Sequence, residues 1–189
     1  MPDLEEAKRK PHDARAVANL LLARARRRGL EISNLQLQKL LYFAHGAFLT
    51  RHRAPLVSGY FEAWKLGPVH PEVYASFKSA GSDPIMFEAV RRDPRTGVVS
   101  PLASIDDFLV EDAIDNILRT LGDMPAARLV AMSHARNGPW DFVVNELATS
   151  RSMGTRISDK VTSDRFQYLK VAIPADLDQS EALEDAPFA

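Results

Sequence analysis

The chain has 189 residues and a mass of 21.0 kDa, a length that suits one globular domain with short tails. With 46% hydrophobic and 26% charged residues it is not a disordered chain, and no apolar run reaches the roughly 18 residues of a membrane span. The formal net charge of −1 argues against a nucleic-acid coat or a polybasic membrane binder. Cysteine is absent, which excludes disulfides and thiolate chemistry and suits a reducing compartment. We therefore expect a soluble cytoplasmic protein with no membrane partner.

The N-terminal part is predicted to be an arm followed by a helix. Residues 1–12 mix acidic and basic side chains, contain two prolines and show no apolar period, so we expect a flexible arm. Asp13 is a suitable N-cap for a helix whose apolar residues recur at helical spacing over residues 14–25. Gly29 ends this helix. Arginines crowd residues 24–28 at its end, where cations complement the helix dipole.

The most hydrophobic segment is predicted to be a second helix over residues 35–49, capped by Ser33 or Asn34. Leucines, an alanine and a phenylalanine form an apolar stripe along it, but Tyr42 and Phe43 lie outside this stripe. An apolar surface that extends around most of a helix indicates a central, buried helix.

A change of period after residue 55 predicts a short stretch of sheet. Tyr60, Glu62 and Trp64 alternate with Phe61, Ala63 and Lys65 in a short β-prone run, and Gly67-Pro68 is expected to stop that strand. Pro71 suits the first position of a brief helix that extends to Ser79. Residues 85–99, with a turn rich in Asp, Pro and Gly in their middle, are typical of a β-hairpin.

The remaining segments are predicted to be helical. Ser104 has capping-box spacing ahead of an apolar stripe over residues 110–121. Pro125 opens a helix that Asn137-Gly138 stops, and Pro139 begins another short one. Ser158 or Asp159 starts a final helical stretch.

Residues 172–189 are predicted to be a disordered acidic tail, because they hold five of the 25 acidic residues, none of the 24 basic ones and no apolar period. The rest of the chain then carries a formal charge of +4. Together the elements predict a mainly α fold: a single compact helical domain over residues 13–171 around the buried central helix, with a small β-hairpin or short sheet.

No sequence pattern typical of catalysis, metal binding or cofactor binding is found. His45 and His52 could share a helix face but lack the carboxylates of a metal site. Ser133 and His134 are adjacent and point in different directions on a helix, so they do not form a nucleophile and its base. Phosphate-cradling glycine loops are absent. We expect no enzyme, no metal and no cofactor. A cluster of four carboxylates is better explained by the N-terminus of a helix: Asp106, Asp107, Glu111 and Asp112.

Two segments are unusual for a purely structural role. Gln38, Tyr42 and His45 align on one face of the apolar central helix, where they either lock the core through hydrogen bonds or serve a partner. The segment over residues 61–69 combines aromatic residues, Lys65 and a rigid Gly-Pro corner. Aromatic residues are favoured both in cores and at recognition surfaces, so both interpretations stay open.

Read in order, these segments resemble the Panacea-domain antitoxins, a phage-associated family. The resemblance rests on Leu-Gln-Lys-Leu-Leu-Tyr at residues 37–42, Ala-Trp at 63–64 and Gly-Pro-Val at 67–69. Val73-Tyr74, Ser133-His134 and Pro139-Trp140 extend it. It implies a mostly α-helical domain that performs no catalysis and neutralises a toxin protein. The residues that it marks as family-motif or toxin-binding candidates are Gln38, Lys39, Tyr42, Trp64, Lys65, Pro68, Tyr74, His134 and Trp140.

The resemblance further implies a proteolytic adaptor that binds a SocB-like toxin and delivers it to the ClpXP protease. An adaptor needs a mobile segment for the protease, and the acidic tail offers Leu183 and Phe188 as apolar tether candidates. One alternative is an antitoxin that simply masks its toxin. Another is a DNA-binding regulator that uses Arg24, Arg26, Arg27 and Arg28. Nucleic acid is the less favoured partner, because the central helix is too apolar to read a DNA groove.

Overall fold

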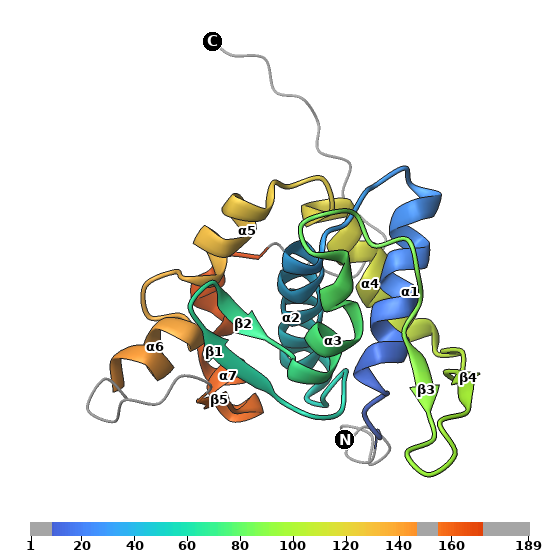
Figure 1. The fold of residues 1–189 in the computed structure, drawn as a ribbon. Coiled ribbons are helices and arrows are strands. Elements are labelled where there is room, and N and C mark those ends of the chain that lie inside the picture. The colour runs from blue at the N-terminus through green and yellow to red at the C-terminus, as the bar shows by residue number, and fades with distance from the viewer. Residues whose placement is uncertain (1–8, 147–154, 172–189) are drawn as a thin grey trace.

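We describe a computed structural model of the protein, which defines residues 9–146 and 155–171 (Figure 1). These residues form seven α-helices, two short 3₁₀ helices and two small antiparallel sheets. The predicted mainly α fold is confirmed. In chain order the elements are α1 (Ala14–Arg27), α2 (Asn34–His52), β1 (Phe61–Trp64), β2 (Gly67–Val69), α3 (Pro71–Phe77), η2 (Lys78–Ala80), β3 (Val90–Arg92), β4 (Val99–Pro101), α4 (Phe108–Leu121), α5 (Ala126–Ser133), α6 (Pro139–Glu146), β5 (Arg156–Ile157), α7 (Asp159–Arg165) and η3 (Phe166–Leu169).

Helix α2 is buried along most of its length. Ser33 caps it through a capping box, in which its hydroxyl accepts from the Gln36 amide and the Gln36 side chain bonds back to the Ser33 amide. The helix contacts α1, α3, α4, α5, α7 and β2, so apolar side chains all around it are covered. In Figure 1 it lies between the α1 and α4 pair on one side and the β1–β2 hairpin on the other. Most residues of α2 are therefore buried, including Tyr42 and Phe43 outside the predicted stripe.

Packing between α1 and α4 involves the predicted arginine cluster. Asp13 caps α1, as expected, by accepting from the Arg15 amide. At the other end of α1, Arg24 bonds Glu111 and Asp115 on α4, and Arg28 bonds the same Asp115. The clustered arginines therefore include two that connect neighbouring helices across their packed surface.

Two sequence expectations are corrected. Strand β1 already ends at Trp64, and Gly67-Pro68, expected only to stop that strand, instead begins β2, which pairs with β1 in a sheet of order β2-β1-β5. Proline is tolerated on an edge strand because its missing N–H faces away from the neighbouring strand. The N-cap of α4 is Asp107 and not Ser104, because the Asp107 carboxylate accepts from the Leu109 amide and is held by Arg9 and His12.

Residues 9–12 contact the folded body. Arg9 pairs with Asp107, and the His12 backbone bonds that of Leu56 and Ser58. The rest of the predicted arm and the predicted tail, with Leu183 and Phe188, lie outside the described residues. Among the residues that the structure does describe, no helix is long and apolar enough to cross a membrane.

Candidate protein-interaction site

The β1–β2 hairpin brings the two unusual sequence segments together. Trp64 pairs with Gly67 in the hairpin register, so Lys65 and Leu66 form its exposed turn. Gly67 has φ +97°, a conformation that L side chains rarely adopt, and an added Cβ would lie 2.3 Å from the Ser133 hydroxyl. The hairpin backbone is therefore pressed directly against the end of α5.

Two polar side chains of α2 form hydrogen bonds to the backbone of β2 and of the residue that follows it. Lys39 is fully buried and donates from Nζ to the Pro68 carbonyl at 2.8 Å, and burial lowers the pKa of Lys39 to about 7. Gln38 accepts the His70 N–H at 2.9 Å and donates to the Asn34 side chain at 3.1 Å. The Leu-Gln-Lys segment is thus joined in the interior to Pro68 and to His70, which directly follows the Gly-Pro-Val segment.

The next turns of α2 extend the buried polar contacts toward α7. The Tyr42 hydroxyl shares a hydrogen bond with Thr162 at 3.2 Å, and burial raises the pKa of Tyr42. His45 Nε2 lies 3.0 Å from the Asp159 carboxylate, and His45 Nδ1 accepts the Val57 N–H at 3.4 Å. The aligned polar face of α2 is therefore satisfied within the chain, as its core interpretation requires.

Trp140 and His134 support the hairpin from the side. The Trp140 indole donates to the Trp64 carbonyl at 2.8 Å, and the His134 ring stacks on it at 3.8 Å between centroids. His134 Nε2 is buried without a hydrogen-bond partner among the described residues. Burial, followed by the nearby charge of Lys39, lowers the pKa of His134. The Ser133 hydroxyl donates to the Val130 carbonyl, whereas the ring of its neighbour His134 stacks on Trp140.

The outer surface of the hairpin is aromatic and exposed. The Trp64 ring meets Tyr74 edge-on at 4.9 Å, and its indole donates to Glu62 at 2.7 Å. Leu66 is 49% exposed and Tyr74 38%. Large apolar groups on a rigid, exposed turn are typical of protein-binding surfaces. We call this surface the hairpin face and define it as Tyr60, Trp64, Lys65, Leu66 and Tyr74.

The structure divides the nine candidate residues by burial. Lys65 and Tyr74 are exposed on the hairpin face, whereas Trp64, His134 and Trp140 are each half-buried. The other four are buried, and a docked protein cannot touch a buried side chain unless the fold opens. These are Gln38, Lys39, Tyr42 and Pro68.

Sequence reasoning missed some partners in this site. It did not single out Thr162 and Asp159, which hold Tyr42 and His45, because no local pattern connects residues so distant in the chain. Leu66 was noted only as part of its segment, although its exposure makes it prominent on the hairpin face. Within the described residues, no group of three or more His, Asp or Glu side chains is placed to hold a metal ion.

The sequence belongs to a known class of protein, the antitoxins with a Panacea domain. The sequence model of the family "Antitoxin SocA-like, Panacea domain" matches residues 37–141, which is more than half of the chain, and the protein belongs to this family. The chain is also 48% identical over 178 residues to "Antitoxin SocA" of Caulobacter vibrioides (strain NA1000 / CB15N), covering 93% of each sequence. No solved structure matches the chain.

Proposed function

We propose that this protein is an antitoxin that binds a SocB-like toxin through the hairpin face and delivers it to the ClpXP protease. The family and the relative named an antitoxin support the first part. The observation that carries the docking site is the exposed Leu66 turn beside Trp64 and Tyr74, held from within by Lys39 and Trp140. A rigid surface loses little entropy on binding, which favours affinity.

Charge substitution at the hairpin turn tests the docking site. The toxin candidate is the product of the open reading frame beside this gene, copurified and then titrated against purified variants by calorimetry. Leu66→Glu places a charge in the centre of the proposed interface, and we expect binding about tenfold weaker, or ~1.4 kcal/mol. Val98→Glu is the matched control, because Val98 is 61% exposed on the other hairpin. Weaker binding by the Val98 variant alone would place the interface elsewhere.

Delivery is tested separately from binding. Toxin, unfoldase, peptidase and ATP are mixed with the full-length protein, and toxin loss is followed over time. Leu183→Asp and Phe188→Asp then change the apolar tether candidates without shortening the chain. We expect these variants to bind toxin normally but to slow its degradation. Unchanged degradation would remove the tail as the tether, and a toxin that stays intact with the full-length protein would favour simple masking.

A further inference from the structure

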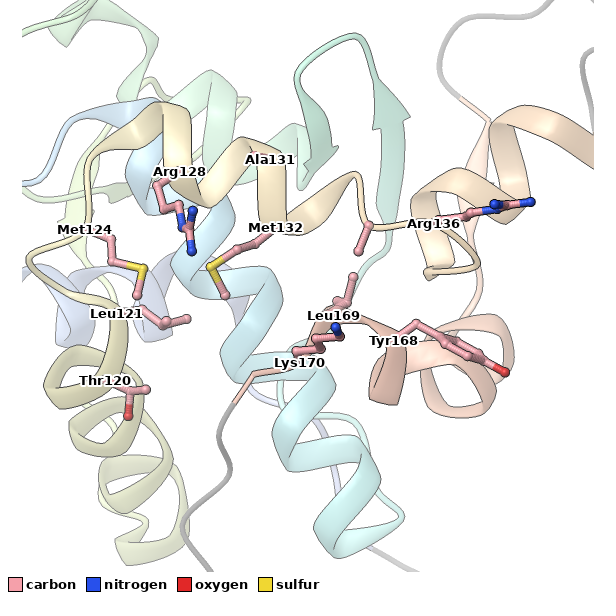
Figure 2. Close-up of a pocket in the computed structure, with 11 residues that line it drawn as sticks. Thr120, Leu121, Met124, Arg128, Ala131, Met132, Arg136, Tyr168, Leu169 and Lys170 are labelled. Atoms are coloured by element: carbon pink, nitrogen blue, oxygen red, sulfur yellow. The ribbon is translucent and has the colours of Figure 1, made fainter.

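A groove of about 620 Å³ opens on the other side of α5 from the hairpin, between the end of α4, α5 and η3 (Figure 2). Its apolar lining comes from all three elements, with Leu121 at the end of α4, Met132 on α5 and Leu169 on η3. Met124, in the connection between α4 and α5, adds a second methionine. Methionine side chains adapt to irregular partners, so this lining suits a peptide segment.

Positive charge borders the groove. Arg128, Arg136 and Lys170 line it and are exposed. Their side chains form no ion pair with any residue in the described part of the chain, in contrast to Arg24 and Arg28, which are paired across α1 and α4. An apolar channel with three unpaired cations at its border favours a segment that is acidic and carries apolar residues at intervals.

Such a segment follows the groove directly in the sequence. Residues 172–189 begin two positions after Lys170, contain five acidic residues and no lysine or arginine, and include Leu177 and Leu183. Val171, the last described residue, packs against the core. Leu177 is six residues further on, so an extended chain of ~3.3–3.6 Å per residue gives it a reach of about 20 Å.

We propose that residues 172–189 bind in this groove of their own chain, with their carboxylates on Arg128, Arg136 and Lys170 and their leucines against Met124 and Met132. A tether this short keeps the segment at an effective concentration of about millimolar, so weak contacts suffice for occupancy. The docked segment covers apolar surface that the folded body otherwise exposes. This interaction depends on neither toxin nor protease and goes beyond the antitoxin function.

The absence of cysteine from the natural chain permits a direct test in the full-length protein. Ser180→Cys provides a single attachment point for a nitroxide spin label, and Met124 and Met132 provide methyl NMR signals inside the groove. We expect these two methyl signals to lose most of their intensity when the label is oxidised and to regain it on reduction. The amide signals of Gly97 and Val98, on the β3–β4 hairpin away from α5 (Figure 1), are expected to stay unchanged.

Two charge variants distinguish binding of the tail in the groove from signal loss caused only by its short connection to the groove. In the first variant, every acidic residue of the tail is replaced by its amide. In the second, Arg128→Gln and Arg136→Gln remove two exposed cations at the border of the groove without changing the core. Both variants are expected to restore the two methyl signals, as is high salt, because screening weakens exposed charge pairs. Equal signal loss in the natural chain and in both variants would overturn the proposal.

A mixing experiment decides which copy supplies the segment. Protein with labelled methionines and no nitroxide is combined with nitroxide-bearing protein whose methionines are unlabelled. Signal loss only within one chain supports the proposal. Loss between chains would assign the groove to the tail of a second copy and overturn binding to the same chain.

Discussion

The Trp140 indole N–H donates to the backbone carbonyl of Trp64 at 2.8 Å, and this bond connects α6 to the exposed hairpin. Both tryptophans belong to the segments that first indicated the family. Their relationship makes Trp140 a support for the hairpin face, whose exposed aromatic residues are Tyr60 and Tyr74.

Substitutions at Trp140 should separate packing from this hydrogen bond. Trp140→Ala removes the ring stacked on His134 and is expected to lower the free energy of unfolding by about 3 kcal/mol. Trp140→Phe keeps an aromatic ring but loses the indole donor. We expect it to lower the free energy of unfolding by about 1 kcal/mol. Urea denaturation followed by circular dichroism measures both values. If both variants lose the same free energy of unfolding, the whole effect comes from the lost indole hydrogen bond and not from packing of the ring.

Gly67 should tolerate substitution far less well than another glycine of positive φ. Gly67→Ala combines a disfavoured backbone conformation with a Cβ 2.3 Å from the Ser133 hydroxyl, so a loss of about 3 kcal/mol is expected. Gly97 has φ +72° and open space around it, so Gly97→Ala should cost about 1 kcal/mol through the backbone alone. Thermal unfolding of the two variants provides the comparison, and similar melting temperatures would contradict close packing at Gly67.

Lys39 should give the protein a pH-dependent stability. The pKa of Lys39 is lowered by burial to about 7 from its ordinary 10.5. Between these values the unfolded chain binds more protons than the folded chain, so the free energy of unfolding should rise with pH across this window. The rise approaches about 1.4 kcal/mol per pH unit and is absent below pH 7, where Lys39 is charged in both states.

Urea titrations at several pH values between 6 and 10 measure this rise. It should disappear in Lys39→Met, which has no ionisable group, and persist in Lys65→Met, which changes an exposed lysine of the same site. A rise that survives in the Lys39 variant would have to come from another titrating group.

The arginines at the end of α1 should not confer operator binding. Arg24 and Arg28 are held by Glu111 and Asp115 on α4, which reduces their attraction for phosphate. We expect gel-shift experiments with the native promoter to show no sequence-selective retention at physiological salt. Retention that is selective and lost in the Arg26→Ala, Arg27→Ala double variant would instead support a DNA-binding regulator.

Local signals predicted the helices well and the tertiary contacts poorly. Asp13 caps α1 as expected, because an N-cap acts on the amides of its own first turn. Ser33 and Ser158, each one of two residues considered, cap α2 and α7. Ser104 has equally suitable spacing, but the N-cap of α4 is Asp107. The Asp107 carboxylate is also held by Arg9 and His12, near the start of the chain. Sequence spacing contains no information about such distant partners.

For the candidate site, the sequence indicated many of the residues but not how they are arranged in space. Gln38, Tyr42 and Trp64 were singled out, because polar groups on an apolar helix and aromatic residues beside a Gly-Pro corner are unusual, whereas Thr162 and Asp159 were not. The arrangement was not predictable, because the Lys39 bond to Pro68 joins residues 29 positions apart through the interior. Burial then separated the residues that position the hairpin from those that can meet a partner.

The pairing of Phe61 with Ile157 means that the three-stranded sheet cannot be completed until both of its distant parts have been synthesised. Strands β1 and β2 are made early, yet the second edge of β1 stays open until β5 is synthesised 96 residues later, about 5 to 20 s at ordinary translation rates. During that interval a nascent chain exposes unpaired backbone groups to any neighbouring strand. The sheet that carries the hairpin face is completed only after Ile157 has been made, so a shorter nascent chain presents an incomplete binding surface.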